Sequence, residues 1–295
     1  MLIPVLAATL LSATTALHAQ ESLLISELLY QPRSGEAEYV ELYNNSDSDA
    51  DLADYHIVRW IGDSLGKHYE LPSHRVAAHD YVVLTKDASS VTACYDVRYA
   101  TKLVECALPP YPNDGGSVIV CTADSVVVDR LDYRPDMHSR LLRNKAGVAL
   151  ERRSASRASS ERSNWFSASS VCGYGTPGYE NSQSTEYLVE ESAFNFSSTL
   201  VSPDADGYQD ELTIEYRLDD GSLAAQIDVY DGRGQKVRSL MNNGLLGTHG
   251  TLVWDGRGDG GRQLAAGQYI VLVRLYALDG THQTIRRALG LVNPH

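Results

Sequence analysis

A serine, an aspartate and a histidine stand in patterns that serve ester hydrolysis. Residues 62–66, GDSLG, match both G-x-S-x-G and the GDSL motif, and residues 279–282, DGTH, match D-x-x-H. A hydrolase of this kind needs its serine on a tight turn between a buried strand and a helix, beside N–H groups that bind an oxyanion. Ser64 instead precedes a proline-containing segment with the pattern of a strand, which favours a surface loop. A secreted GDSL-type serine esterase using Ser64, Asp279 and His282 is the enzymatic alternative.

Three aspartates have the spacing of cation ligands. Asp204, Asp206 and Asp210 lie in SPDADGYQDE, within an acidic stretch from 202 to 231. Carboxylates at alternate positions can place oxygens around Ca²⁺ at about 2.4 Å, so calcium is the candidate cofactor. The segment departs from an EF-hand loop, because Gln209 stands where that loop needs glycine. The alternative is that these residues simply make a turn into the next strand.

A basic segment runs from residue 130 to 162, with nine Lys and Arg against four acidic residues. Arginine forks bind phosphate and carboxylate groups, which makes this segment a candidate for surface polysaccharide or nucleic acid. A solvated face is the ordinary alternative. The whole chain carries 25 basic and 38 acidic residues, a net charge of −13, which argues against a dedicated nucleic-acid binder. The candidate binding residues are Arg140, Arg143, Arg152 and Arg153.

Cysteine and histidine usage bears on metals and disulfides. An even number of cysteines in an exported chain predicts disulfides, and four cysteines allow three pairings. We prefer Cys94 with Cys106 and Cys121 with Cys172. The sequence holds no C-x-x-C, which disfavours a zinc ribbon. The histidines are scattered without H-E-x-x-H, so a catalytic zinc is not predicted.

The first residues predict export. Residues 1–19 carry no charge, are apolar and small, and end in Leu-His-Ala, which fits a signal peptide cut near Ala19. The segment departs from the usual pattern in lacking Lys or Arg at its start. Thr, Ser and His dilute it below what a membrane anchor needs, and no later segment comes close. We therefore expect a secreted or cell-surface protein without a membrane span.

The elements that position these residues are strands. Apolar residues recur with period two in short runs between turn residues, and no window longer than about ten residues shows a helical stripe. In residues 38–44, Val40 and Leu42 point to one face while Tyr39, Glu41 and Tyr43 point to the other. The prediction is an all-β protein with two immunoglobulin-like sandwiches in tandem, over residues 22–182 and 191–295, joined by a linker at 183–190.

Both halves resemble known families. The I-S-E strand at 25–27, EYVELYN at 38–44 and the exit GYGTPGYENS at 173–182 resemble a bacterial secreted lamin tail domain. The second half, with SPDADGYQD, QIDVYDGRGQKV and LVWDGRGDGGRQLAAGQYIVLVR, resembles the immunoglobulin-like domain shared by the flagellar hook-capping protein and the sorting domains of type IX secretion cargo.

The resemblance implies a function without chemistry. It implies an exported pair of β-sandwiches for surface display or adhesion, and a lamin tail domain brings no catalytic residues to carry over. If the last domain is of the sorting type, its partner is the secretion or cell-surface machinery. Whether that domain is a cleaved sorting signal or a permanent spacer stays open, as does the identity of the ligand.

Overall fold

The computed structural model describes residues 23–62, 64–185, 193–219 and 221–292. The predicted signal peptide and most of the predicted linker lie outside these residues. The regular elements of the described chain are mostly strands, with one α-helix, α1 (Ala88–Cys94), and short 3₁₀ turns. The all-β prediction is confirmed. The 3₁₀ turns are η1 (Leu52–Asp54), η2 (Ala100–Lys102), η3 (Pro135–Met137), η4 (Arg162–Asn164), η5 (Ser170–Cys172) and η6 (Asp259–Gly261).

The first half of the chain forms two main sheets. The six-stranded sheet has the order β10 (Leu103–Glu105), β9 (Tyr81–Thr85), β2 (Tyr39–Asn44), β1 (Leu23–Leu29), β13 (Leu150–Arg152), β14 (Trp165–Ser167). The four-stranded sheet has the order β12 (Val127–Tyr133), β11 (Gly116–Thr122), β4 (Tyr55–Val58), β7 (Tyr69–Glu70). Two small ladders complete it, β3 (Ala50–Asp51) with β8 (Arg75–Val76) and β5 (Trp60–Ile61) with β6 (Ser64–Leu65).

The core of this half comes from both main sheets. Leu28 and Leu42 from the first sheet join Ile57, Val120 and Leu131 from the second in one buried cluster. Each contributes at roughly 25 cal/mol per Å² of apolar surface removed from water. Strand β1 is buried at every position, because its other face is covered as well. The prediction that Tyr39 and Glu41 leave the core face is right, but both are fully buried, which corrects the expectation of a plain two-layer sandwich strand.

The second half is also a sandwich. Its three-stranded sheet has the order β15 (Ala193–Phe196), β17 (Leu212–Arg217), β20 (His249–Trp254). Its five-stranded sheet has the order β16 (Leu200–Val201), β22 (His282–Leu291), β21 (Gly267–Tyr276), β18 (Ala224–Asp231), β19 (Lys236–Leu245). In β21 the inward side chains alternate as predicted, and they close over Trp254 in a second core. We call the two halves the first and second domains.

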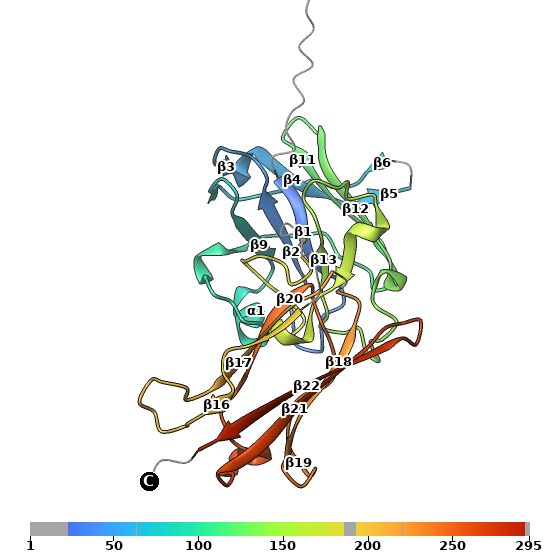
Figure 1. Cartoon of the computed structure of the whole chain (residues 1–295). Helices are drawn as coiled ribbons and strands as arrows, with labels where there is room; N and C mark the ends of the chain where they lie inside the picture. The colour runs from blue at the N-terminus through green and yellow to red at the C-terminus, as the bar shows by residue number, and fades with distance from the viewer. Residues whose placement is uncertain (1–22, 63, 186–192, 220, 293–295) are drawn as a thin grey trace, which may run out of the picture.

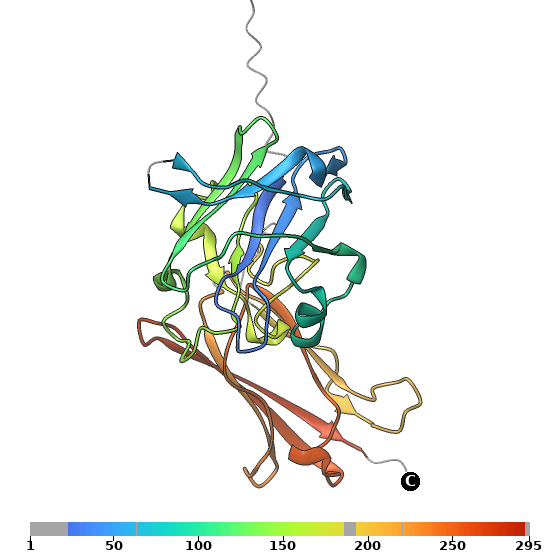
Figure 2. The same cartoon turned by 180° about the vertical axis from the view of Figure 1, so that it is seen from behind.

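The two domains lie end to end. In Figure 1 the sheets of the first domain form the upper body and the long strands β21 and β22 cross the lower one. Figure 2, from behind, shows the described chain ending at the far side of the second domain. Among the described residues, none of the helices has the length and apolar character needed to span a membrane.

Candidate functional site

The most unusual feature of the first domain is a row of three buried glutamates. Glu27 in β1 is the cross-strand partner of Glu41 in β2 and of Glu151 in β13, so the three side chains share one face of the six-stranded sheet. All three are fully buried. Carboxylates are almost never buried unless they are paired or hydrogen-bonded, so this row needs partners.

The partners come from the chain after β14, residues 168–184, which we call the strap. The backbone N–H of Thr176 donates to Glu27, that of Gly178 donates to Glu41 at 2.6 Å, and that of Gln183 donates to Glu151 at 2.9 Å. The strap thus covers the outer face of the sheet and binds each glutamate in turn. These three hydrogen bonds hold the strap on the sheet.

The hydroxyl of Thr176 indicates that the row carries at least one proton. Its Oγ1 lies 2.8 Å from Glu27 Oε2, 3.0 Å from Glu151 Oε1 and 3.2 Å from Asn181 Oδ1. A hydroxyl has one hydrogen to donate, so it cannot satisfy three acceptors as a donor. A protonated carboxyl that donates to the hydroxyl oxygen resolves the contact.

Burial also favours protonation of these carboxyls. Desolvation raises the pKa of Glu27 to about 7, although hydrogen bonds from Tyr39 and Thr176 act to lower it. Desolvation, with repulsion from Glu27, raises the pKa of Glu151 to about 8 and that of Glu41 well above its ordinary value. The row is therefore a neutral or partly neutral cluster near pH 7, unlike the exposed acids elsewhere on the chain.

The strap also holds the second domain. Gln183 Nε2 donates to Ser167 O and to Gly221 O, and Thr248 N donates to Ser182 O at 2.9 Å. A Cβ at Gly247 would lie 2.2 Å from Ser182 O, so glycine permits this close approach. The predicted linker from 183 to 190 thus starts with a residue that is buried in the domain junction.

Two clefts flank the junction. One of about 490 Å³ is lined by strap and second-domain residues, including Glu180, Arg217 and His249. The other, of about 570 Å³, includes Arg140, Trp165 and, from the second domain, the exposed Leu278. Clefts at domain junctions are the usual places for ligands. A ligand in either cleft can contact both domains.

The four predicted binding arginines do not form one stripe. Arg152 is 5% exposed and its Nη1 donates to Asp129 Oδ2 at 2.9 Å. Arg153 donates to Asp219 O across the junction and lies over the Phe166 ring. Arg140 and Arg143 are exposed.

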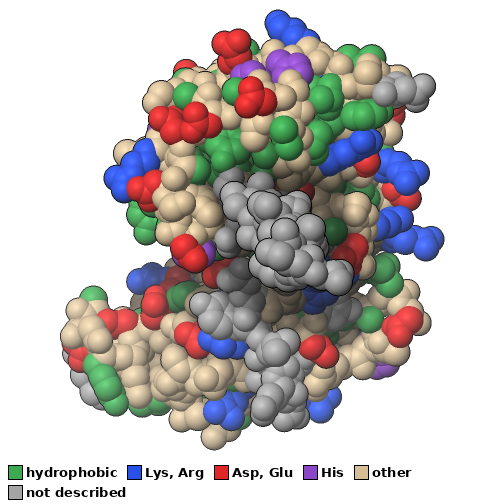
Figure 3. All heavy atoms as spheres, turned by 90° about the horizontal axis from the view of Figure 1, so that it is seen from above, with side chains coloured by type: hydrophobic (Ala, Val, Ile, Leu, Met, Phe, Trp, Pro, Cys, Tyr) green, Lys and Arg blue, Asp and Glu red, His purple; other side chains and the backbone are tan. Residues whose placement is uncertain are grey.

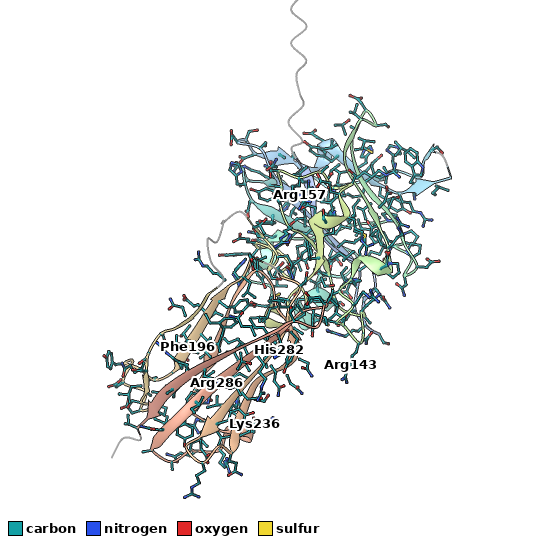
Figure 4. All side chains as sticks on the ribbon, turned by 45° about the vertical axis from the view of Figure 1, so that its right-hand side comes forward. Arg143, Arg157, Phe196, Lys236, His282 and Arg286 are labelled. Atoms are coloured by element: carbon teal, nitrogen blue, oxygen red, sulfur yellow. The ribbon has the colours of Figure 1, made fainter. Side chains whose placement is uncertain are left out.

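The surrounding charges are mixed as well. Figure 4 shows Arg143 well apart from Arg157 of the same basic segment. Figure 3 shows basic side chains scattered over the face seen from above, with acidic ones among them. Of the four predicted arginines, two hold the structure together and two are open to solvent.

The predicted calcium ligands do come together. One oxygen from each of Asp204, Asp206 and Asp210 lies within 4.8 Å of the others. Asp210 accepts hydrogen bonds from the N–H groups of Ala205 and Gly207, and that of Gly207 contributes most to lowering its pKa. The cluster combines the spacing of cation ligands with the hydrogen bonds of a turn, so calcium binding at this segment stays a prediction.

The four predicted disulfide cysteines are free thiols in the structure. Cys94 lies in α1, Cys121 is buried in β11, and Cys172 Sγ donates to Ser169 O. Cys94, Cys106 and Cys121 pack against three different hydrophobic clusters. The preferred pairing joins cysteines from separate places, and neither of its two bridges is present.

The serine, aspartate and histidine of the esterase alternative are not brought together. Ser64 is exposed in the short strand β6 of the first domain, whereas His282 begins β22 in the second (Figure 1). Asp279 Oδ1 accepts from the N–H and hydroxyl of Thr281 and so caps a turn. Ser64 also lacks the strand-to-helix turn that this chemistry requires.

The glutamate row was missed by sequence reasoning. Its signal is present in the ISE and EYVEL strands and in the GYGTPGYENS exit, which are three separate signatures in the sequence. In such strands acidic residues alternate with buried apolar ones. When the chain also has a segment with many hydrogen-bond donors and no hydrophobic period, that segment can cover the face of the sheet that carries the carboxylates. Only the pairing of β1 with β13 across more than 100 residues joins them.

Two family models match parts of the chain. Residues 17–135 match the family model of the Lamin Tail Domain, and residues 198–277 match that of the FlgD Ig-like domain. No curated protein matches the chain. Strands β13 and β14 and the strap lie beyond the first match.

Solved structures show only distant likeness. CopC from Methylosinus trichosporium OB3b is 18% identical, with 36% of this chain and 97% of that chain covered and a TM-score of 0.26. Latent PorU from Porphyromonas gingivalis is 8% identical, with 92% and 34% covered and a TM-score of 0.28. PorZ from the same organism is 11% identical, with 86% and 35% covered and a TM-score of 0.24. The chain spans about a third of the length of PorU and PorZ.

Proposed function

We propose that this protein, which joins a lamin tail domain to a FlgD Ig-like domain, is an exported cell-surface protein without enzymatic activity. In this proposal the first domain is a binding or structural module, and the second is a secretion-sorting domain or a spacer. The partner is the secretion or cell-surface machinery, or a surface polysaccharide. The proposed domain bounds are residues 22–182 and 191–295.

One observation carries the proposal: the polar residues that could do chemistry are used to build the molecule. The buried glutamates bind the strap, Arg152 binds Asp129, and Asp279 caps a turn. What stays accessible is loops, sheet faces and the two clefts at the domain junction. Such surfaces suit binding and display.

The role of the second domain is tested by fractionating cells that express the chain with and without residues 190–295. If this domain is a sorting signal, the full chain reaches the cell surface and the truncated chain stays inside. If the truncated chain reaches the surface and its mass has changed only by the deletion, the second domain is a spacer and not a sorting signal. Melting of the truncated chain in lysate shows that it is folded.

Calcium binding at Asp204, Asp206 and Asp210 is a second proposed function, favoured by the convergence of their oxygens. A ligand at a hundredfold its Kd stabilises the folded state by about 2.7 kcal/mol. We therefore expect a higher melting midpoint in calcium than in chelator, and no such difference after Asp206→Asn. Asp255→Asn, at another turn of the same domain, is the matched control. Equal midpoints for the unaltered protein in calcium and chelator would remove these residues from the site.

A further inference from the structure

Two histidines face each other at the four-stranded sheet of the first domain. His56 lies in β4, and His68 immediately precedes β7, which pairs with β4. Their Nδ1 atoms are 3.1 Å apart, and their ring planes are perpendicular with centroids 5.4 Å apart. Both side chains are half-buried. The rings are therefore not stacked, and they contact each other through their Nδ1 atoms.

Strand geometry places a carboxylate on the same face. His56 is the cross-strand partner of Glu70, and cross-strand partners point to the same side of a sheet. Glu70 also lies two residues after His68, which matches the period of a strand. Its side chain is exposed and can turn toward the two rings. The face therefore brings two imidazoles and one carboxylate within reach of one another.

We propose that His56 and His68 bind a divalent transition-metal ion of the Zn²⁺ and Cu²⁺ class, with Glu70 as a third ligand. Nitrogens that each lie 2.0–2.1 Å from one ion are about 2.9–3.4 Å apart at bond angles between about 90° and 109°. The observed separation falls inside this range. Neutral imidazole is the commonest ligand for these ions.

This site differs from the aspartate cluster in its chemistry. The aspartates offer oxygen only, which suits Ca²⁺, whereas nitrogen ligands select Zn²⁺, Cu²⁺ or Ni²⁺. Among the described residues, the aspartates are the one group with three ligand atoms within 4.8 Å. In the histidine site, His56 and His68 are therefore already in position, and Glu70 becomes the third ligand when its side chain turns toward the two rings. The alternative is a hydrogen bond in which one Nδ1–H donates to the other ring and no ion binds.

The test is a calorimetric titration of the full chain with CuCl₂ and with ZnCl₂ near pH 7.5. The protein carries no histidine tag, and an excess of Ca²⁺ occupies the aspartates. We expect saturable binding of one ion, weakened at least about tenfold by His56→Ala or by His68→Ala. His282→Ala, an exposed histidine of the second domain, is the matched control and leaves the affinity unchanged.

One further measurement keeps the result interpretable. Melting curves in chelator show whether each variant is folded, and His56→Gln and His68→Gln replace an alanine variant that is not. Absence of saturable binding, or equal affinity in the unaltered chain and both histidine variants, would overturn the proposal.

Discussion

The melting midpoint of the full chain falls as the pH rises from about 6.5 to about 8, because the buried glutamates then lose protons that the fold requires. Glu27, with a folded pKa of about 7, and Glu151, with about 8, hold their protons well above the ordinary glutamate pKa of 4.5. The folded state thus binds more protons than the unfolded state in this window, and stability declines with pH. A single retained proton changes the free energy of unfolding by about 1.4 kcal/mol per pH unit.

Below pH 6.5 a buried histidine changes the stability in the direction opposite to that of the glutamates. Burial lowers the pKa of His138 to about 3, so below about pH 6.5 the unfolded state takes up a proton that the folded state refuses. This proton uptake by the unfolded state makes the stability rise with pH. At lower pH it therefore opposes the effect of the glutamates, which makes the stability fall with pH. Above pH 6.5 this histidine contribution fades, and the loss of the glutamate protons dominates the slope up to about pH 8.

Glu151→Gln tests the assignment. The amide keeps the volume and cannot ionise, so the fall of the midpoint between pH 6.5 and 8 becomes shallower than in the unaltered protein. Glu211→Gln, an exposed acid in the second domain, leaves the slope unchanged. A midpoint that is flat or rises across this window, or the same slope in all three proteins, would contradict a protonated row.

Arg152→Ala is expected to cost about 3–5 kcal/mol of stability, because it leaves a buried aspartate without its cation. Asp129 is 7% exposed, and its Oδ2 accepts from Arg152, from Ile25 N–H and from the hydroxyl of Ser159. This network ties β12 to β1 and to the chain before β14. The measurement is the free energy of unfolding by urea, with circular dichroism as the readout.

Arg140→Ala and Arg143→Ala are the controls. Both are exposed, and removing such a side chain changes stability by about 0.5 kcal/mol or less. A loss of equal size in all three variants would show that Arg152 does not have the structural role described here. The sequence groups these arginines together, and this comparison separates the buried Arg152 from the exposed Arg140 and Arg143.

Local patterns predicted the elements well. The alternation in β2 and β21 follows directly from side chains that point to opposite faces, and the all-β fold follows from it. The alternation does not predict what covers the face of the sheet that points away from the core. Glu41 alternates as an exposed residue would, and only the return of the strap buries it.

Long-range contacts explain what sequence could not predict at the candidate sites. The aspartate cluster is local, spanning seven residues, and its convergence was predicted from spacing alone. Glu27 and Glu151, by contrast, meet through strand pairing across more than 100 residues. His56 and His68 looked scattered because their contact depends on the register of β4 with β7. Arg152 lies in an exposed-looking basic run, and its burial depends on Asp129 in another sheet.

We propose that this protein acts at the cell surface through binding, without enzymatic activity. The most direct measurement is digestion of intact cells expressing the full chain by an added protease, with an internal protein as the control for lysis. We predict that the chain is cleaved while the internal protein survives. Full protection of the chain until the cells are broken would contradict the account.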